Sequence, residues 1–429
     1  MELPLEGLRP RRALLIAASL ILLAFTYQSA KDWAADHGVQ SGELRWTQRA
    51  VALEPENGES WEHLGRLKQW DFSEPDPQAA IEAYQRAVRD DPNSAQYWMD
   101  LSSAYEGAGD MAQARTALDR AKAAYPLSAE VAWNYGNFLL RQQKLSDGYA
   151  EIRRALRSDE SLLPLAISRT WRSNGDVTQM LEQVLPADLS AYFQAIDYFG
   201  SVHEPGAELV VWQRVLDLHQ PFDLRRVFPF IDSLMSEDRP AEARRAWTEA
   251  LVATGMSHED PSDGSLIWNG DFEHEFLNGG LDWRWSPPIG VAVDFETAPT
   301  SHGSRALRLD FAGGSNVELV GPMQLVPVEP NRTYRFHAYM RTESMTTESG
   351  VRFSISDAKR SVQAMTDNLT GTRTWAPQEV EFTTSPETYL LNVRLYRAPS
   401  RMFDNRLSGA AWIADVWLKP VDEPEKASR

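Results

Sequence analysis

The sequence has no cysteine, and this absence removes several kinds of chemistry. A chain without cysteine has no disulfide, no thiolate nucleophile and no cysteine-ligated zinc or iron–sulfur centre. Basic residues are also few beside acidic ones, since 43 Lys and Arg stand against 61 Asp and Glu, a formal net charge of −18. Because an acidic surface repels phosphate backbones, we expect no nucleic acid among the partners.

Common signatures of catalysis are missing as well. There is no Gly-x4-Gly-Lys loop, no Gly-x-Ser-x-Gly elbow and no His-Glu-x-x-His pair. A glycosidase needs two carboxylates across a cleft, and no acidic pair stands out here. Glu273, His274 and Glu275 are consecutive in an extended segment, so their side chains point to alternate faces. We predict that the protein is not an enzyme, and a polysaccharide-active enzyme remains an alternative.

The chain has one long uncharged apolar run, Ala13 to Ala30. Its 18 residues are close to the shortest helix that spans a bilayer. Arg9, Arg11 and Arg12 precede it, which predicts a cytoplasmic N-terminus at 1–12, a transmembrane signal anchor at 13–30 and export of the rest to the periplasm or another extracytoplasmic space. A cleaved signal peptide is the alternative.

Residues 95–128 read as two amphipathic helices around a tight turn at Gly109-Asp110. The large residues come early, small ones stand where the helices would cross, and Pro126 closes the unit. This pattern resembles the tetratricopeptide repeat. Further units in register begin at Trp61 and Trp133, and a helical period persists to residue 257. The resemblance implies one continuous α-solenoid over 31–257 that binds protein partners.

The resemblance also places certain positions of each first helix on a concave groove. In this sequence they are Glu62, Arg66, Gln69, Met99, Ser103, Asn134, Asn137 and Arg141. Asparagine and arginine along such a groove suit the backbone or a carboxylate of a bound peptide. The alternative is a polar surface with no dedicated ligand.

The period changes after an acidic stretch rich in turn-forming residues, which predicts a linker at 258–265. Six later segments alternate with a period of two. They are ALRLDF at 306–311, TYRFHAYMR at 333–341, VRFSIS at 351–356, EVEFTT at 379–384, LLNVRLYR at 390–397 and AWIADVWL at 411–418. Short alternating strands indicate an antiparallel β-sandwich over 266–421. The charged tail 422–429 is predicted to be disordered.

Six motifs follow one another in this half of the chain. They are WNGDFE at 268–273, WRW at 283–285, SHGSRALRL at 301–309, VEPNRTYRFHAYMR at 328–341, WAPQEVEFTT at 375–384 and AWIADVWL at 411–418. Their order resembles the β-jelly-roll carbohydrate-binding modules attached to xylanases and other polysaccharide-degrading enzymes. The resemblance implies a jelly roll and a possible role in glycan binding, although the same fold also serves structural domains.

Strand alternation predicts which side chains of this domain face solvent. With Tyr334 and Phe336 inward, the outward residues are Arg335, His337, Tyr339 and Arg341, then Asn392, Arg394 and Tyr396, and also Arg352, Ser354 and Ser356. Tyrosine rings beside arginine and asparagine suit a sugar, and an ordinary solvated sheet is the alternative. Trp283 and Trp285 are predicted to stack on glycan from a loop. The strand positions of Trp268, Trp375, Trp412 and Trp417 predict core residues.

Modules of this family often hold one structural calcium ion. The resemblance maps its carboxylates onto Glu273 and Asp415, which would join the two ends of the domain. The alternative is that both residues cap turns or pair with arginines. No other cofactor is expected.

Together these features predict a non-enzymatic, membrane-anchored adaptor of the cell envelope. Its repeats would bind protein partners and its jelly roll would bind glycan, in polysaccharide assembly or export. One alternative is a structural assembly factor whose jelly roll binds no sugar.

Overall fold

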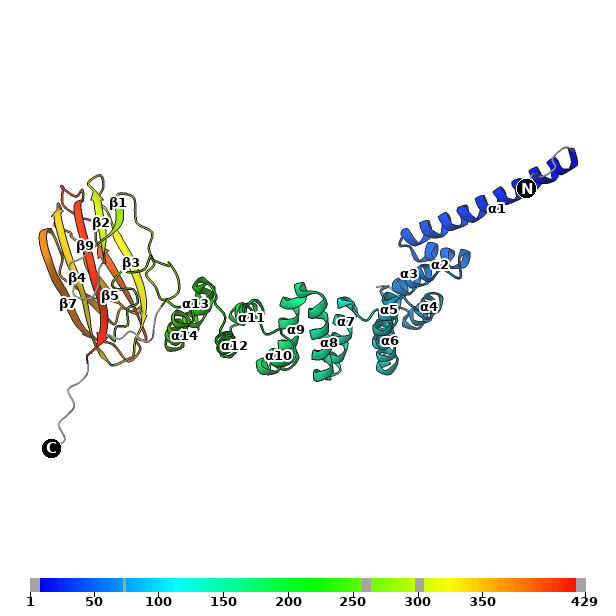
Figure 1. Ribbon diagram of the computed structural model, residues 1–429, viewed down its shortest axis with the longest axis horizontal. Helices are drawn as coiled ribbons and strands as arrows, with labels where there is room; N and C mark the ends of the chain where they lie inside the picture. Colours follow the sequence, from blue (N-terminus) through cyan, green and yellow to red (C-terminus); the bar gives the residue numbers. More distant parts are fainter. Residues whose placement is uncertain (1–7, 72–74, 257–263, 298–304, 422–429) are drawn as a thin grey trace, which may run out of the picture. The chain divides into compact units, whose positions relative to one another are not determined.

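The computed structural model of the chain describes residues 8–71, 75–256, 264–297 and 305–421 (Figure 1). The chain forms two compact units, Met1–Leu185 and Pro186–Arg429. Most of the predicted linker and the whole predicted tail lie outside the described residues, as do residues 1–7 and the first four residues of the SHGSRALRL motif. Each unit is described separately below.

Helix α1, Leu8–Gln40, contains the whole of the predicted anchor. Its segment Arg12–Gln40 is long and apolar enough to cross a membrane, with a mean hydropathy of 1.8 over its most apolar stretch. A signal sequence would have the same length and composition. Near its C-terminal end, Ala35 and Val39 pack against Ala50 of α2, Leu44–Leu53. The apolar segment of α1 is exposed, whereas the C-terminal end of the helix packs on the helical core.

The remaining helices of the first unit form antiparallel pairs (Figure 1). They are α3 Gly58–Gln69, α4 Pro77–Asp90, α5 Ala95–Gly107, α6 Met111–Ala124, α7 Ala129–Arg141, α8 Leu145–Ser158, α9 Leu163–Asn174 and α10 Val177–Gln183. Side-chain caps start several of them, since Asn57, Asp76, Ser94, Asp110 and Ser128 each accept a hydrogen bond from a backbone N–H of the first turn. The predicted helical repeats are confirmed over these residues.

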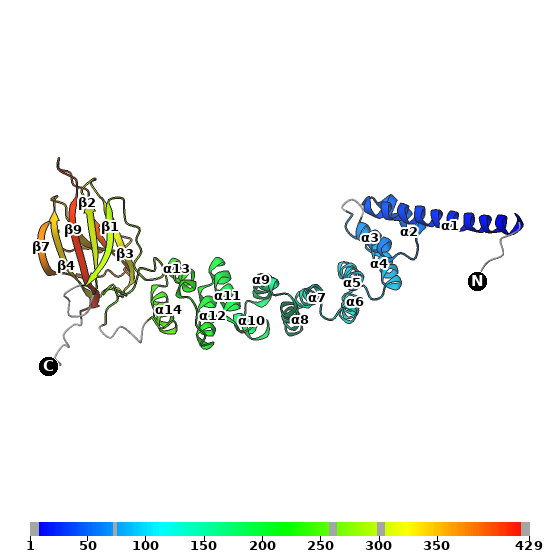
Figure 2. The ribbon, with the colours of Figure 1, turned by 45° about the horizontal axis from the view of Figure 1, so that its top comes forward.

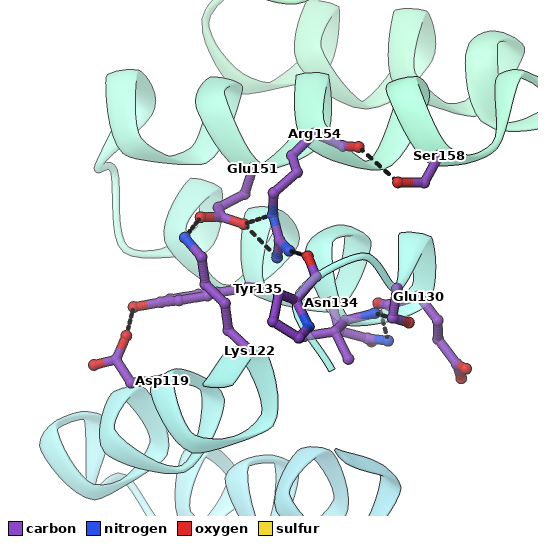
Figure 3. Close-up of polar contacts among 11 residues, drawn as sticks. Asp119, Lys122, Glu130, Asn134, Tyr135, Glu151, Arg154 and Ser158 are labelled. Atoms are coloured by element: carbon purple, nitrogen blue, oxygen red, sulfur yellow. Dashed lines mark hydrogen bonds and ion pairs between the residues drawn. The ribbon is translucent and has the colours of Figure 1, made fainter. Parts of the chain in front are cut away.

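Neighbouring repeats are joined by apolar packing and by a partly buried ionic network (Figure 3). Glu151 on α8 accepts from Lys122 on α6 at 2.5 Å and from Arg154 at 2.8 Å. The Tyr135 hydroxyl on α7 donates to Asp119 at 2.6 Å, and burial raises the pKa of Tyr135 to about 12. The network ties α6, α7 and α8 together.

The second unit begins with four further helices: α11 Leu189–Ser201, α12 Pro205–Asp217, α13 Phe228–Ser236 and α14 Pro240–Ala253. Trp212 is fully buried among them, and its Nε1 donates to Glu249 at 2.7 Å. Glu208 is buried as well, and burial raises its pKa to about 7. These four helices belong to the same compact unit as the β domain. The helical array that the sequence predicts as one stack is therefore split between the two units.

Over residues 264–297 and 305–421 the β domain contains nine strands: β1 Val291–Thr297, β2 Arg305–Ala312, β3 Leu319–Pro327, β4 Thr333–Met345, β5 Arg352–Ser356, β6 Gln363–Met365, β7 Gly371–Thr383, β8 Leu390–Arg397 and β9 Ser408–Pro420. They make a five-stranded sheet, β1-β2-β9-β4-β7, and a four-stranded sheet, β3-β8-β5-β6, with antiparallel pairing throughout. Figure 2 shows the two layers. The predicted β-sandwich and its six strands are confirmed, whereas β1, β3 and β6 were not predicted.

One core lies between the two sheets. It includes Phe336, Met340, Phe353, Leu395 and Ile413, all nearly or fully buried. These residues alternate with outward ones along β4, β5, β8 and β9. Each strand therefore places its other residues on one of two outer faces.

Two glycines let the last helices approach the β domain closely. A Cβ at Gly279 would lie 2.1 Å from Phe228 of α13, and one at Gly280 would lie 2.3 Å from Trp247 of α14. Gly280 also has a positive φ of 57°, which favours glycine. Arg284 completes the junction by donating to Asp232 at 2.6 Å. Helices α13 and α14 are thus packed directly on the sandwich.

Candidate binding surfaces

The eight predicted groove residues lie on the first helices of three successive repeats, α3, α5 and α7. Gln69 Nε2 donates to Ser103 Oγ at 3.0 Å, and Arg141 Nε donates to Glu106 Oε1 at 2.7 Å. These partners are 34 and 35 positions apart, which is about one repeat. The structure brings the predicted residues into one row, and their role in binding stays a prediction.

The two arginines of this row already have carboxylate partners. Arg66 Nε donates to the buried Glu62 at 3.0 Å, and Arg141 binds both oxygens of Glu106, with the second contact also at 2.7 Å. A carboxylate of a bound peptide would have to compete with these pairs. The row is therefore not a set of free cations.

Sequence reasoning missed Asp100, which lies beside Met99 on α5. Burial, together with the nearby Glu62 carboxylate, raises the pKa of Asp100 to about 6. Gln96 Nε2 donates to Asp100 Oδ1 at 3.0 Å. The only signal in the sequence was the position of this acid next to a predicted groove residue.

The two predicted asparagines of α7 differ in how much they offer a partner. Asn134 Nδ2 donates to the Glu130 carbonyl at 2.9 Å (Figure 3). The same Nδ2 lies 3.6 Å from Met99 Sδ. Asn137 is only 7% exposed, and its Nδ2 donates to the Trp133 carbonyl at 2.9 Å. Its Oδ1 has no partner in the part of the chain that the structure describes. Asn137 therefore presents little surface to a partner.

The outward residues of β4 lie on the outer face of the five-stranded sheet, and the basic ones are paired with acidic residues of β7 or of β4 itself. Arg335 Nε donates to Glu381 at 2.7 Å, and His337 Nδ1 lies 3.0 Å from Glu379. Arg341 forms an ion pair with Glu343. Each basic residue predicted on this strand thus has an acidic neighbour.

Three tryptophans predicted to be core residues lie on this same outer face. Trp417 stacks on His337 with ring centroids 4.7 Å apart, and Trp375 stacks on Tyr339 at 5.2 Å. The Arg341 guanidinium lies 4.4 Å from the ring centroid of Trp412. None of the three lies between the sheets, because Ile413 and Leu418 point inward and the alternation of β9 then turns Trp412 and Trp417 outward. Trp412 is nevertheless buried in a smaller apolar cluster on this face, so its predicted burial is confirmed. The core prediction is wrong for Trp375 and Trp417, which are partly exposed.

The outward residues of β8 and β5 lie on the opposite face, that of the four-stranded sheet. Arg352 is opposite Tyr396, Ser354 is opposite Arg394, and Ser356 is opposite Asn392. The glycan-binding candidates are therefore divided between two faces of the sandwich and do not form a single site.

Polar groups on this second face lack partners. Among the described residues, Arg352 and Arg394 make no hydrogen bond or ion pair, and the Nε of each is buried. The buried Oδ1 of Asn392 has no partner in the same part of the chain. The guanidinium of Arg394 lies 5.5 Å from the ring centroid of Tyr396. Buried polar atoms of this kind are costly unless something binds them.

The predicted stacking loop around Trp283 is part of the folded core. Trp283 is fully buried, and its Nε1 donates to the Asn269 carbonyl at 2.9 Å. Arg284 exchanges backbone hydrogen bonds with Met323 at the edge of β3. Trp285 is partly buried against the same core. The prediction that Trp283 stacks on glycan is wrong, because its ring has no exposed face.

The two residues predicted to hold calcium show no clear ligand set. His337 Nε2 lies 3.6 Å from Asp415, and Arg305 donates to the backbone carbonyl of Glu273. Within the described ranges, no group of three or more acidic or histidine side chains is placed to hold a metal ion. Calcium takes roughly six to eight oxygen ligands, which these contacts do not supply. Calcium binding at this pair stays a prediction that the geometry does not favour.

A cavity of about 400 Å³ lies where α14 meets the sandwich. Its lining includes Arg244 and Trp247 of α14 together with Trp268, His274 and Trp417. Trp268 stacks on His274 at 5.5 Å and meets Trp247 edge to face at 5.8 Å. The sequence did not indicate this cavity, because its walls come from distant parts of the chain.

Comparisons with known proteins agree with the repeat architecture. The sequence profile of the tetratricopeptide repeat family matches residues 76–129 and 102–162. No curated protein sequence matches the chain.

Several solved structures are similar to parts of the chain. PilF from Pseudomonas aeruginosa is 15% identical with a TM-score of 0.30, covering 52% of this chain and 92% of its own. The xylan-binding domain CBM22-1 of Paenibacillus barcinonensis Xyn10C is 15% identical with a TM-score of 0.25, covering 36% and 94%. The enzymatically active domain of tailspike protein 4 from bacteriophage CBA120 is 16% identical with a TM-score of 0.27, covering 37% of this chain and 22% of its own.

The repeat profile and the antiparallel pairing of the two sheets carry the assignment. Residues 76–162 consist of tetratricopeptide repeats, and a β-sandwich follows in the C-terminal part of the chain.

Proposed function

We propose that the protein is a non-enzymatic, membrane-anchored adaptor of the cell envelope that acts in polysaccharide assembly or export. Its repeats bind a protein partner along the row on α3, α5 and α7. Its β-sandwich binds a glycan on the outer face of the four-stranded sheet. Helix α1 anchors the chain in the membrane, and the rest is exported.

The protein-binding role is supported by the repeat architecture. Tetratricopeptide repeats stack helix pairs into an extended surface and supply no chemistry of their own. Here groove positions of successive repeats contact each other, Gln69 with Ser103 and Asn134 with Met99, which supports a surface that extends over several repeats.

The glycan-binding role rests on one observation. On the outer face of β5 and β8, the buried Nε atoms of Arg352 and Arg394 and the buried Oδ1 of Asn392 have no partner among the described residues. Sugar hydroxyls can accept from arginine and donate to the amide oxygen, and the Tyr396 ring beside them offers an apolar surface for the C–H groups of a sugar.

A non-catalytic role is supported by the positions of the carboxylates whose pKa is raised. Asp100 lies on α5 of the first unit, Asp197 and Glu208 lie on α11 and α12, and Asp282 is buried in the β domain. None of the four lines the cavity beside α14. They are distributed over three separate parts of the chain, whereas acid–base catalysis needs such groups to converge on one cleft.

Affinity electrophoresis of the full-length chain in detergent tests the proposal. Gels would carry a panel of neutral and acidic polysaccharides. We expect at least one to retard the protein, and we expect Tyr396→Ala to weaken retardation roughly tenfold, the loss of about one aromatic contact. Tyr339→Ala, on the other face, is the matched control and should behave like the parent.

Two results would contradict glycan binding by this face. The first is the absence of retardation by any polysaccharide, which would favour the structural assembly factor. The second is an equal loss in the Tyr396 and Tyr339 variants, which would show that the face does not matter.

A further inference from the structure

We infer that the glycan recognised by the four-stranded sheet is acidic, with carboxylate groups that pair with Arg352 and Arg394. The inference rests on the proposed glycan binding by this face and adds the chemical class of the ligand. Three features of the face carry it: the spacing of the two arginines, the lack of a counter-charge, and the geometry of the guanidinium group.

The two arginines are diagonal neighbours on adjacent strands. Arg352 pairs in register with Tyr396, and Arg394 is two residues before Tyr396 on β8. Diagonal neighbours of this kind are roughly 7–8 Å apart at the backbone, within reach of long side chains. Ser354, opposite Arg394, is nearly fully buried, so the neighbouring side chains cover the sheet here. The arginines thus form one small basic patch.

Among the described residues, no acidic side chain forms an ion pair with either arginine. The residues in register with Arg394 are Met323 on β3 and Ser354 on β5, both neutral. Asp367, exposed just beyond β6 on the side of Arg352, makes no ion pair with it in this part of the chain. Two like charges at neighbouring positions of a sheet repel each other, and burial of part of each guanidinium increases the cost. A bound anion would remove both penalties.

A carboxylate matches the unpaired groups better than a hydroxyl does. The guanidinium fork donates two parallel hydrogen bonds to a planar carboxylate, and such charged pairs are about twice as strong as neutral ones. Asn392 and Tyr396 flank the arginines and supply contacts for the rest of a sugar ring. The combination fits a saccharide that contains uronic acid.

The charge of the whole chain sharpens the inference. With a formal net charge of −18, the protein as a whole repels polyanions. Retention by an acidic polysaccharide therefore requires a local basic site and is not expected from general electrostatic attraction.

Affinity electrophoresis of the full-length chain with matched polymers tests this inference. The probes are polygalacturonic acid and alginate, each beside its carboxyl-reduced neutral form. We expect stronger retardation by the acidic form, and a roughly tenfold loss in Arg352→Met and in Arg394→Met. Arg335→Met on the five-stranded sheet is the matched control and should retain parent binding. Raising the salt concentration should weaken binding to the acidic polymers only.

The outcomes separate the inference from the function it rests on. If the neutral polymers bind as well as the acidic ones, and the two arginine variants match the parent, the inference fails while glycan binding stands. If no polymer in either form retards the parent, both fail. Circular dichroism of each variant confirms that a loss of binding is not a loss of folding.

Discussion

On the outer face of the five-stranded sheet, Arg335 and Arg341 each have a carboxylate partner, whereas on the outer face of the four-stranded sheet Arg352 and Arg394 have none among the described residues. Both faces have the same sequence pattern, in which arginine and tyrosine alternate with core residues. The partner of Arg335 comes from the neighbouring strand β7, and the partner of Arg341 is Glu343 on β4 itself. Strands β7 and β9 bring glutamate and tryptophan beside β4, and β3 and β5 bring methionine, serine and arginine beside β8.

The comparison shows how a stabilised face can be told from a binding face. Where cross-strand partners satisfy every charge, the residues are explained by the stability of the sheet. Where partly buried arginines remain unpaired, the fold bears a cost that a ligand could remove. The following variants test this contrast, starting with the largest expected effect.

The largest difference is expected between Trp412→Ala and Tyr396→Ala. Trp412 is 7% exposed, lies under the Arg341 guanidinium and donates from Nε1 to Glu296 at 2.9 Å. We expect its removal to lower the free energy of unfolding by about 3 kcal/mol. Tyr396 is partly exposed, so Tyr396→Ala should lower the free energy of unfolding by only about 1 kcal/mol. Thermal unfolding followed by tryptophan fluorescence measures both, and equal losses would mean that the two faces contribute alike to stability.

Two matched arginine substitutions are expected to change stability by a smaller amount and in opposite directions. Arg352→Met removes a buried Nε that has no partner among the described residues, so we expect stability to be unchanged or raised by up to about 1 kcal/mol. Arg341→Met removes an ion pair and a contact with Trp412, and should cost about 1 kcal/mol. Urea unfolding of both variants checks the signs. Destabilisation by Arg352→Met would indicate that this residue supports the fold.

The smallest expected effect is on how the stability of the β domain depends on pH, through a carboxyl group of the five-stranded face. Hydrogen bonds from Trp412 and Arg308 lower the pKa of Glu296 below its ordinary value of 4.5. A carboxyl group whose pKa is lowered on folding adds stability above pH 4.5, and this stability is lost as the pH falls through the lower folded value. Glu296→Gln should therefore flatten the loss of stability between about pH 5 and pH 3. Thermal midpoints measured across this range check it.

The four-stranded face provides the control for that titration. Asn392→Asp places a carboxyl group two residues from Arg394 on the same face of β8, where it can supply a counter-charge. We expect this variant to gain stability above pH 5 and to lose it on acidification, as the parent does on the other face. A flat pH response in Asn392→Asp would show that Arg394 does not need a counter-charge.

Much of the fold could be predicted from the sequence because it depends on local patterns. Caps such as Asp110 and Ser128 and the apolar period mark the repeat helices, and alternation marks six of the nine strands. The missed strands have weaker signals: β6 has three residues, and β1 lies at an edge with a half-exposed pattern. Trp283 was misplaced because its segment looks like a loop in sequence but pairs with the edge of β3.

The sequence by itself determined which residues of each strand share a face, because side chains alternate along any strand. It also determined the repeat period that aligns Gln69 with Ser103. Only the tertiary structure decided which strands became neighbours. As a result Arg335 lies opposite Glu381, whereas Arg352 lies opposite Tyr396 and Arg394 lies opposite Ser354. Pairing between distant strands depends on the packing of the whole sandwich, and local sequence does not encode it.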